Sequence, residues 1–279
     1  MGVLERAAAH EAKGEAFAMA TVVRTLSITA AKAGAKALIT PNGAIEEGWI
    51  GGGCAKAAVV KAARQCLIDG RSRLVSIAPQ DGLDALGVAP GEDKDGVLFA
   101  KNACPSQGTM DIFVEPVLPK PRLLILGASP VGVALAAIAP AFGYSVTVAA
   151  PTGDLDRFPQ GPQRIEGLAP PPSTGTEAFV VVSTQGAGDR AALKAAAAMP
   201  ARYRAFVGSR RKAETLRRDL AAEGVAAEAL ADVKAPAGLD IAAVTSEEIA
   251  LSILAEMTAV RRRPERPGAG AENSSGVTP

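Results

Sequence analysis

The chain has 279 residues, of which 48% are hydrophobic and 21% charged, enough for two domains with their own cores. Its formal net charge is +1, from 30 Lys and Arg against 29 Asp and Glu, so no overall field attracts nucleic acid. The longest apolar runs are of strand length or broken by Gly and Pro, so no membrane span is predicted.

Three cysteines, Cys54, Cys66 and Cys104, form no CxxC pair, and the charged segment from Met1 to Lys13 does not resemble a signal peptide. We therefore expect reduced thiols and a cytoplasmic location. His10 is the single histidine, which argues against a Ser/His/Asp triad and against a His-rich zinc site.

The first part of the chain, from about Glu5 to Pro116, predicts a mixed α/β domain. Its strands are predicted over Phe17–Thr25, Lys36–Thr40, Leu74–Ile77, Val97–Phe99 and Met110–Glu115, with a helix over Ala55–Leu67. Pro41-Asn42-Gly43 is a hairpin signal, and Gly70 suits a left-handed helix cap.

Three prolines between Pro116 and Pro121 are typical of a linker and indicate a domain boundary. Beyond them we predict strands over Arg122–Leu126, Tyr144–Ala149, Ala178–Ser183, Arg204–Gly208 and near Ala227–Leu230, with helices between them, including Val133–Phe142, and a last helix over Ser246–Val260. This alternation indicates a doubly wound parallel sheet. The predicted organisation is an N-terminal mixed α/β domain (1–117), a Rossmann-like domain (118–263) and a disordered tail (264–279).

The segment Trp49-Ile50-Gly51-Gly52-Gly53-Cys54 places three glycines and a thiol at the start of a helix. Glycines let backbone N–H groups approach a ligand, and a helix N-terminus favours anions and thiolates. The segment predicts an anion cradle with a reactive or metal-binding Cys54. A tight turn with a small buried thiol fits the motif equally well.

Other residues could join this cradle. Cys66 follows Cys54 by twelve residues in the same predicted helix, about 18 Å along its axis, so we interpret it as a core thiol. Cys104 lies on the loop Asn102–Gly108 and could meet Cys54 in space. Arg24, Lys32 and Lys36 flank the first strands and could supply positive charge.

The turn from Gly127 to Gly132 lies where a dinucleotide-binding GxGxxG motif belongs, but Ser129 replaces its middle glycine. The strand that follows ends at Pro151 without the acid that binds the ribose of NAD. Ordinary NAD binding is therefore disfavoured. A repurposed dinucleotide fold and a different dinucleotide both remain compatible with the turn.

Ser209, Arg210, Arg211 and Lys212 follow a predicted strand at the edge that lines the ligand crevice of open α/β sheets. Arg and Lys at that edge could hold phosphates. A solvated first helical turn explains the same basic run.

Seven segments, in order over almost the whole chain, resemble the XdhC/CoxI family of molybdoenzyme maturation factors, and most closely its CoxF-like branch from carbon monoxide dehydrogenase gene clusters. They are Val22–Thr25, Ala33–Lys36, Gly48–Cys54, Gly108–Pro116, Gly127–Gly132, Phe206–Lys212, and Ala235–Ile241 leading into Ser246–Glu256. The chain departs from many relatives at Ser27–Lys32, where they carry Ser-x-Pro-Arg, and at Ser129-Pro130, where they carry Gly-His. Both departures fit the CoxF-like branch better than the xanthine dehydrogenase branch.

The resemblance implies a protein that binds molybdenum cofactor, protects it or assists its sulfuration, and delivers it to an apo-hydroxylase of the xanthine dehydrogenase or carbon monoxide dehydrogenase class. The expected cargo is the molybdopterin cytosine dinucleotide form, with copper as a further candidate. Gly51, Gly52, Gly53 and Cys54 would contact the cofactor, with Lys32 and Lys36 beside them. The reactive thiols would be those of Cys54 and Cys104, and Cys54 would also be the metal ligand. The residues that contact the nucleotide would be Gly127, Ser129, Gly132, Ser209, Arg210, Arg211 and Lys212.

A maturation factor of this kind captures and hands over its cargo rather than turning over a substrate. It must also contact its client enzyme and other maturation factors, and we expect a homo-oligomer. Two alternatives stay open: an NAD(P)- or flavin-dependent oxidoreductase built on the Rossmann half, and an adaptor that has lost ligand binding.

Overall fold

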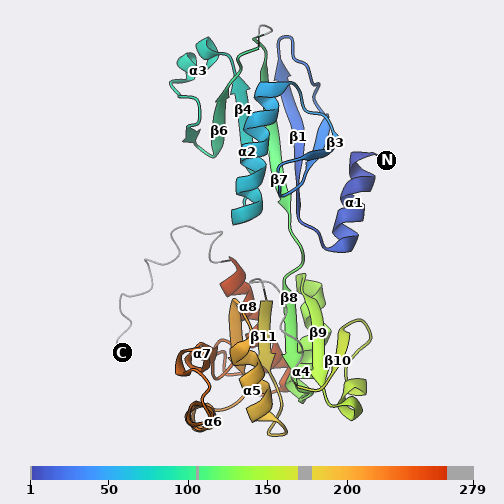
Figure 1. Ribbon diagram of the computed structural model, residues 1–279, viewed down its shortest axis with the longest axis vertical. Helices are drawn as coiled ribbons and strands as arrows, with labels where there is room; N and C mark the ends of the chain where they lie inside the picture. Colours follow the sequence, from blue (N-terminus) through green and yellow to red (C-terminus); the bar gives the residue numbers. More distant parts are fainter. Residues whose placement is uncertain (1, 105–106, 169–177, 263–279) are drawn as a thin grey trace. The chain divides into compact units, whose positions relative to one another are not determined.

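The computed structural model describes residues 2–104, 107–168 and 178–262. They form two compact units, Met1–Pro119 and a second that begins at Lys120 (Figure 1). The predicted fold class is confirmed, since a mixed α/β unit precedes a Rossmann-like unit with a parallel sheet. The predicted disordered tail, 264–279, lies outside the described residues.

The first unit contains a seven-stranded sheet in the order β3-β2-β1-β7-β4-β6-β5. The strands are β1 (Phe17–Leu26), β2 (Lys36–Ile39), β3 (Ile45–Gly48), β4 (Arg73–Ala78), β5 (Asp93–Lys94), β6 (Val97–Lys101) and β7 (Thr109–Val117). Among the described strands of this sheet, β4 and β6 are the one parallel pair. Every long strand of this sheet was predicted to within about three residues of its ends.

Helix α2 (Gly53–Asp69) packs on one face of this sheet (Figure 1). Its buried residues Ala55, Val59, Ala62 and Cys66 recur at the spacing of one helical face, and their small volumes let the helix lie close to the strands. Gly70 ends the helix in the predicted left-handed conformation, at φ 73°, and its N–H donates to the carbonyl of Cys66.

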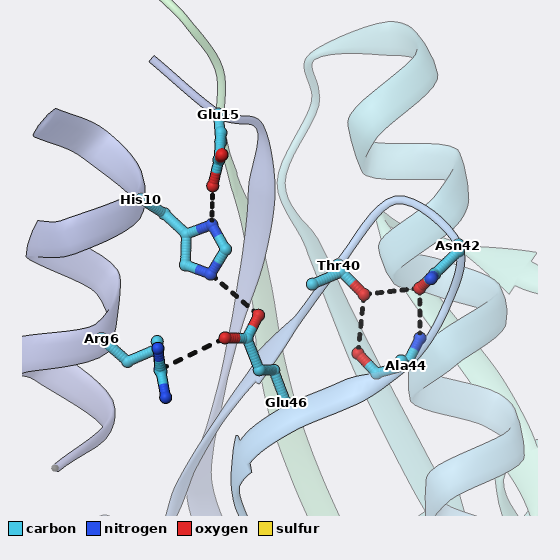
Figure 2. A network of polar contacts seen from close by, with 7 residues as sticks. All are labelled: Arg6, His10, Glu15, Thr40, Asn42, Ala44 and Glu46. Carbon is cyan, nitrogen blue, oxygen red and sulfur yellow. Dashed lines mark hydrogen bonds and ion pairs between the residues drawn. The ribbon is translucent and has the colours of Figure 1, made fainter. Parts of the chain in front are cut away.

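Helix α1 (Val3–Lys13) was not predicted, and polar contacts fasten it to the sheet (Figure 2). The ring nitrogens of His10 lie 2.7 Å from Glu15 and 2.8 Å from Glu46, and Arg6 lies 3.2 Å from the same Glu46 carboxylate. The single histidine is thus engaged in holding α1 against β3.

One end of this sheet gathers the loops that carry the predicted thiols. Strands β1, β4 and β6 all finish where β7 begins, as the pairing of Leu26 with Thr109 and of Ile77 with Met110 shows. The N-terminus of α2 lies at the same end, because Gly51 approaches the side chain of Met110. This end is opposite the one where β7 leaves toward the linker (Figure 1).

The second unit contains a six-stranded sheet in the order β10-β9-β8-β11-β12-β13, with every pair parallel. Its strands are β8 (Arg122–Leu126), β9 (Ser145–Ala150), β10 (Gln163–Glu166), β11 (Ala178–Val182), β12 (Tyr203–Phe206) and β13 (Val233–Lys234). The order reverses between β8 and β11, which makes the carboxyl ends of these two strands the topological switch point.

Helices cover both faces of this sheet (Figure 1). Helices α4 (Pro130–Ile138) and α8 (Ser246–Arg262) build one core with the sheet; α5 (Asp189–Ala198), α6 (Arg210–Ala222) and α7 (Ala227–Ala231) build the other. A 3-10 turn (Ala139–Phe142) completes the predicted helix Val133–Phe142, and another, Thr152–Arg157, follows β9.

One predicted strand is wrong. Ala227–Leu230 is helical, because the run Ala-Glu-Ala-Leu-Ala combines strong helix formers with no β-branched residue, and the strand comes later at Val233–Lys234. The short elements α3 (Gln80–Leu86), β5 and β10 were not predicted. Within the described part of the chain, no helix has the length and apolarity needed to cross a membrane.

Candidate functional site

The start of α2 is an open helix N-terminus. Gly51 is buried at φ 118°, and a Cβ there would come within 3.2 Å of Met110. Gly52 and Gly53 are exposed, and a Cβ at either would meet no atom within 4 Å. Because the N-cap Gly52 has no side chain and the first turn has no acid, the leading N–H groups remain available to an anion.

The two candidate thiols lie at this end of the sheet. Cys54 is half-buried in the first turn of α2, and Cys104 is exposed on the loop after β6. Asn102 shapes that loop: its side chain donates to the carbonyl of Gly108 at 2.6 Å and accepts the N–H of Cys104 at 3.0 Å. Both thiols are free and accessible, as a role in ligand binding requires.

Cys66, by contrast, is a core thiol. It is fully buried, its Sγ lies 3.6 Å from the carbonyl oxygen of Val114, and Arg73 donates to it at 3.5 Å. Burial raises the pKa of the Cys66 thiol, despite the opposing influence of Arg73, and keeps it protonated.

The predicted positive charges are distributed unevenly. Lys32 is exposed on the loop between β1 and β2. The ammonium of Lys36 donates to Thr21 at 2.9 Å, on the sheet face opposite α2, since its neighbour Ala37 packs in the α2 core. Arg24 is paired with the buried Asp111 at 2.5 Å. The structure therefore leaves Lys32 as the residue of this set best placed to meet a ligand at the loop end.

A groove that the sequence did not predict runs along α2. We call it the α2 groove: it has a volume of about 500 Å³, begins at Gly53, and is lined by Lys56, Lys61 and Arg64 on the helix and by Gly43 on the hairpin between β2 and β3. The sequence contains a signal for it, because Arg64 follows Lys61 by three residues and Lys56 by eight, spacings that bring Arg64 to the same side of a helix as each lysine.

Among the described residues, no group of three or more His, Cys, Asp and Glu side chains lies close enough to hold a metal ion. A metal contact at Cys54 would therefore involve no more than two of these side chains, and the metal would bring its other ligands with it. A soft thiolate suits molybdenum–sulfur or copper(I) chemistry of that kind.

The turn from Gly127 to Gly132, at the switch point of the second sheet, packs closely against the residues that follow β11. A Cβ at Gly127, whose φ is 96°, would lie 2.7 Å from the carbonyl oxygen of Ser183 and the Cα of Thr184. The N–H of Ser129 donates to the Ser183 carbonyl at 3.0 Å, and the two hydroxyls of these serines lie 2.5 Å apart. Gly132 provides close helix–strand packing, since a Cβ there would lie 3.2 Å from Ile125 and Ser183.

Ser129 also caps α4, because its hydroxyl accepts the N–H of Gly132 at 3.3 Å. The side chain that replaces the middle glycine is thus engaged within the turn, with Gly132 and Ser183 as its partners. At the end of β9 the chain continues as Pro151 and Thr152, and the hydroxyl of Thr152 donates to Glu166 on the neighbouring β10. The sequence did not predict a carboxylate here. Glu166 lies on β10, whereas the acid that binds the ribose of NAD would stand at the end of β9.

Ser209, Arg210, Arg211 and Lys212 do follow β12 at the carboxyl edge, and Ser209 caps α6 by accepting the N–H of Lys212 at 3.3 Å. Arg210 and Arg211 are exposed, and Arg211 lines a pocket of about 370 Å³. Lys212 is engaged: its ammonium lies 2.5 Å from the buried carboxylate of Asp189 and over the ring of Phe206.

Asp189, another residue the sequence did not single out, holds the loops after β11 and β12 together. Its carboxylate accepts bonds from the hydroxyl of Thr184 and the N–H of Gly186 as well as from Lys212. Burial acts to raise the pKa of Asp189, but these bonds and the charge of Lys212 together bring the pKa below its ordinary value. Asp189 is therefore ionised, and the ammonium of Lys212 is its ion-pair partner.

The fold and this geometry define a class: a two-unit protein whose second unit is Rossmann-like with a packed glycine turn, and whose first unit has an open helix N-terminus. Two family models match the chain, "XdhC and CoxI family" over residues 10–78 and "XdhC Rossmann domain" over residues 123–257. The chain belongs to the XdhC/CoxI family, which confirms the family predicted from the sequence, while the CoxF-like branch stays a prediction. Membership supports a role in molybdoenzyme maturation in general.

A curated relative is the "uncharacterized protein YqeB" of Escherichia coli strain K12, which is 31% identical over 278 aligned residues. The alignment covers 94% of this chain but 46% of YqeB, so the chain spans less than half of that relative's length. Among solved structures, a Bacillus halodurans protein described as a xanthine dehydrogenase is 18% identical, with a TM-score of 0.46 and 98% of both chains covered. A similarity at that level carries no argument about function.

Proposed function

We propose that this protein is a maturation factor that binds molybdenum cofactor as cargo, protects it or assists its sulfuration or metal completion, and delivers it to an apo-molybdoenzyme. The observation that supports this most directly is the open N-terminus of α2, where Gly52 and Gly53 leave free space beside the accessible thiol of Cys54. In this proposal the first-turn N–H groups hold an anionic oxygen of the cargo, and Cys54 contacts the metal or its sulfur.

The finer parts of the proposal come from the sequence resemblance to the CoxF-like branch. They are that the cargo is the cytosine dinucleotide form, that the client belongs to the xanthine dehydrogenase or carbon monoxide dehydrogenase class, and that copper is a further candidate cargo. Cys104, on the adjacent loop, is the second thiol in the proposal. Contact with a client and with other maturation factors, and self-association, belong to the same hypothesis.

The oxidoreductase alternative has less support. Ser129 caps α4 with the side chain that stands in place of the fingerprint's middle glycine, and its own N–H is bonded to Ser183. A pyrophosphate would have to displace these bonds. We therefore expect neither NAD(P) nor flavin to remain with the purified protein.

The test is to purify the full chain anaerobically from cells that make molybdenum cofactor, and to quantify bound molybdenum and released cytosine nucleotide. We expect near-equimolar cofactor in the wild type and most of it lost in Cys54→Ser, with a smaller loss in the matched variant Cys104→Ser. Cofactor content unchanged in Cys54→Ser would remove the thiol from the proposal. A protein empty of molybdenum that retains a flavin or nicotinamide would favour the oxidoreductase instead.

A further inference from the structure

The α2 groove carries positive charge that no carboxylate of the described residues neutralises. Lys56, Lys61 and Arg64 are exposed, and within the described ranges none of them forms a salt bridge. Among the residues that the structure describes, none that lines the groove is acidic. The uncapped N-terminus of α2 at Gly53 adds the positive end of the helix dipole to the same surface.

The wall opposite the helix is ordered by a small polar network (Figure 2). The side-chain oxygen of Asn42 accepts the hydroxyl of Thr40 at 2.6 Å and the N–H of Ala44 at 3.0 Å, which fixes the hairpin turn. The carbonyl oxygen of Asn42 then accepts a bond of 2.6 Å from Arg64, whose guanidinium lies across Gly43. This bond holds the guanidinium of Arg64 in place and uses one of its five N–H groups, so the others can donate to a ligand.

The spacing of the charges indicates an elongated anion. From Gly53 to Arg64 is eleven residues, about 16 Å along a helix, which exceeds the reach of a single phosphate. A volume of about 500 Å³ is that of a small-molecule pocket. A diphosphate joined to a nucleoside has the length, charge and size that these features fit.

We propose that the α2 groove binds the diphosphate and nucleoside arm of the cargo, with the arm entering at Gly53 beside Cys54. This inference rests on the proposed function and deepens it, because it moves the phosphate site from the Rossmann unit to the first unit. The sequence placed that site at the turn from Gly127 to Gly132 and at Ser209 to Lys212. There, however, Ser129 and Ser209 cap their own helices and Lys212 is paired with Asp189.

The test is calorimetric titration of the full-length, cofactor-free protein with cytidine 5′-diphosphate and, separately, with inorganic phosphate. We expect saturable binding of the nucleotide that weakens as salt is added, and much weaker binding of phosphate. The double variant Lys56→Gln/Lys61→Gln should weaken nucleotide binding about tenfold or more, whereas Lys13→Gln/Lys194→Gln, which removes two exposed charges elsewhere, should change it less than about twofold.

Three results would overturn the inference: no binding of cytidine 5′-diphosphate to the wild type, unchanged binding in Lys56→Gln/Lys61→Gln, or a loss of binding in Arg210→Gln/Arg211→Gln that the groove variant does not share. The circular dichroism spectrum of each variant checks that it is folded. The outcome is separable from the proposed function. A chain that carries no molybdenum but binds the nucleotide through Lys56 and Lys61 refutes the cargo and keeps the groove, whereas a cofactor-loaded chain indifferent to these lysines refutes only the groove.

Discussion

The helices α2 and α4 both begin at a glycine-rich turn, yet their N-termini differ in what occupies them. At α2 the N-cap is Gly52, no side chain accepts the leading N–H groups, and the space beside Gly52 and Gly53 is open. At α4 the N-cap is Ser129, its hydroxyl accepts the N–H of Gly132, and the turn packs against Ser183. The glycines at the start of α2 leave space in which a ligand could lie. The glycine of the α4 turn, Gly127, instead allows the turn to pack closely against Ser183 and Thr184.

Similar sequence motifs therefore have different local structures in the two units. A GxGxxG-like turn after a buried strand is the stronger sequence signal for a nucleotide, yet Ser129 and Pro130 make it a structural turn. The Gly51–Cys54 segment is the weaker signal, and it retains the free donors. The comparison can be tested by substitutions that close the open end or disturb the closed one.

The largest effect is expected at Gly127. Alanine there must adopt φ 96° with its Cβ about 2.7 Å from backbone atoms of Ser183 and Thr184, so Gly127→Ala should lower the free energy of unfolding of the second unit by about 3 kcal/mol. The matched change at the open end, Gly53→Ala, meets no atom within 4 Å and should be neutral or slightly stabilising.

Urea unfolding can separate the units, because the single tryptophan, Trp49, lies in the first unit and both tyrosines, Tyr144 and Tyr203, lie in the second. Trp49 fluorescence and the near-ultraviolet circular dichroism of the tyrosines therefore report on different units. Equal destabilisation by Gly127→Ala and Gly53→Ala would mean that the two turns are equally packed, against the comparison.

The next effect is expected at Asp189, which holds Lys212. Asp189→Asn keeps the shape but removes the charge, and it should cost about 2.5 kcal/mol because the carboxylate is buried while Lys212 is partly exposed. The expected pH dependence follows from the lowered pKa of Asp189. A carboxylate with a depressed folded-state pKa stabilises the protein above the unfolded-state pKa, and this stabilisation is lost as pH falls through the folded-state pKa.

The difference in stability between wild type and Asp189→Asn should therefore be full above about pH 4 and shrink as the pH falls below it. Tyrosine circular dichroism during urea unfolding at several pH values measures it. A difference that stays constant down to pH 2 would mean that the ionised carboxylate is not what holds Lys212.

The sequence predicted the fold better than the site, for a physical reason. Strands such as Arg122–Leu126 and the helix ends at Gly70 are encoded by neighbouring residues, through apolar runs and glycine caps. The pairing of Lys212 could not be predicted in this way, because Asp189 is 23 residues away and becomes its partner only when β11 and β12 pair. The α2 groove likewise needs the hairpin at Gly43, which the chain brings to the helix only through the sheet.

A smaller effect is expected at Ser129. Ser129→Ala removes the cap of α4 and leaves the buried hydroxyl of Ser183 without this partner, so it should cost about 1.5 kcal/mol. Ser209→Ala removes the equivalent cap of the exposed α6 N-terminus and should cost about 1 kcal/mol or less. Tyrosine-monitored unfolding compares the two, and a larger cost at Ser209 would contradict the closed packing inferred for the α4 turn.

The smallest change in stability, and the sharpest test of the comparison, is expected from Gly52→Ser, which gives α2 the kind of cap that α4 has. Gly52 has an extended backbone, at φ −76° and ψ −168°, and open space around it, so a serine fits without strain. Its hydroxyl would accept an N–H of the first turn and stabilise the first unit by about 0.3 kcal/mol. The same bond removes a donor from the open end, so the variant should bind cytidine 5′-diphosphate more weakly while being slightly more stable, as measured by calorimetry and Trp49 fluorescence. If binding were unchanged in a variant that is measurably stabilised, the free N–H groups of α2 would not be what holds the anion.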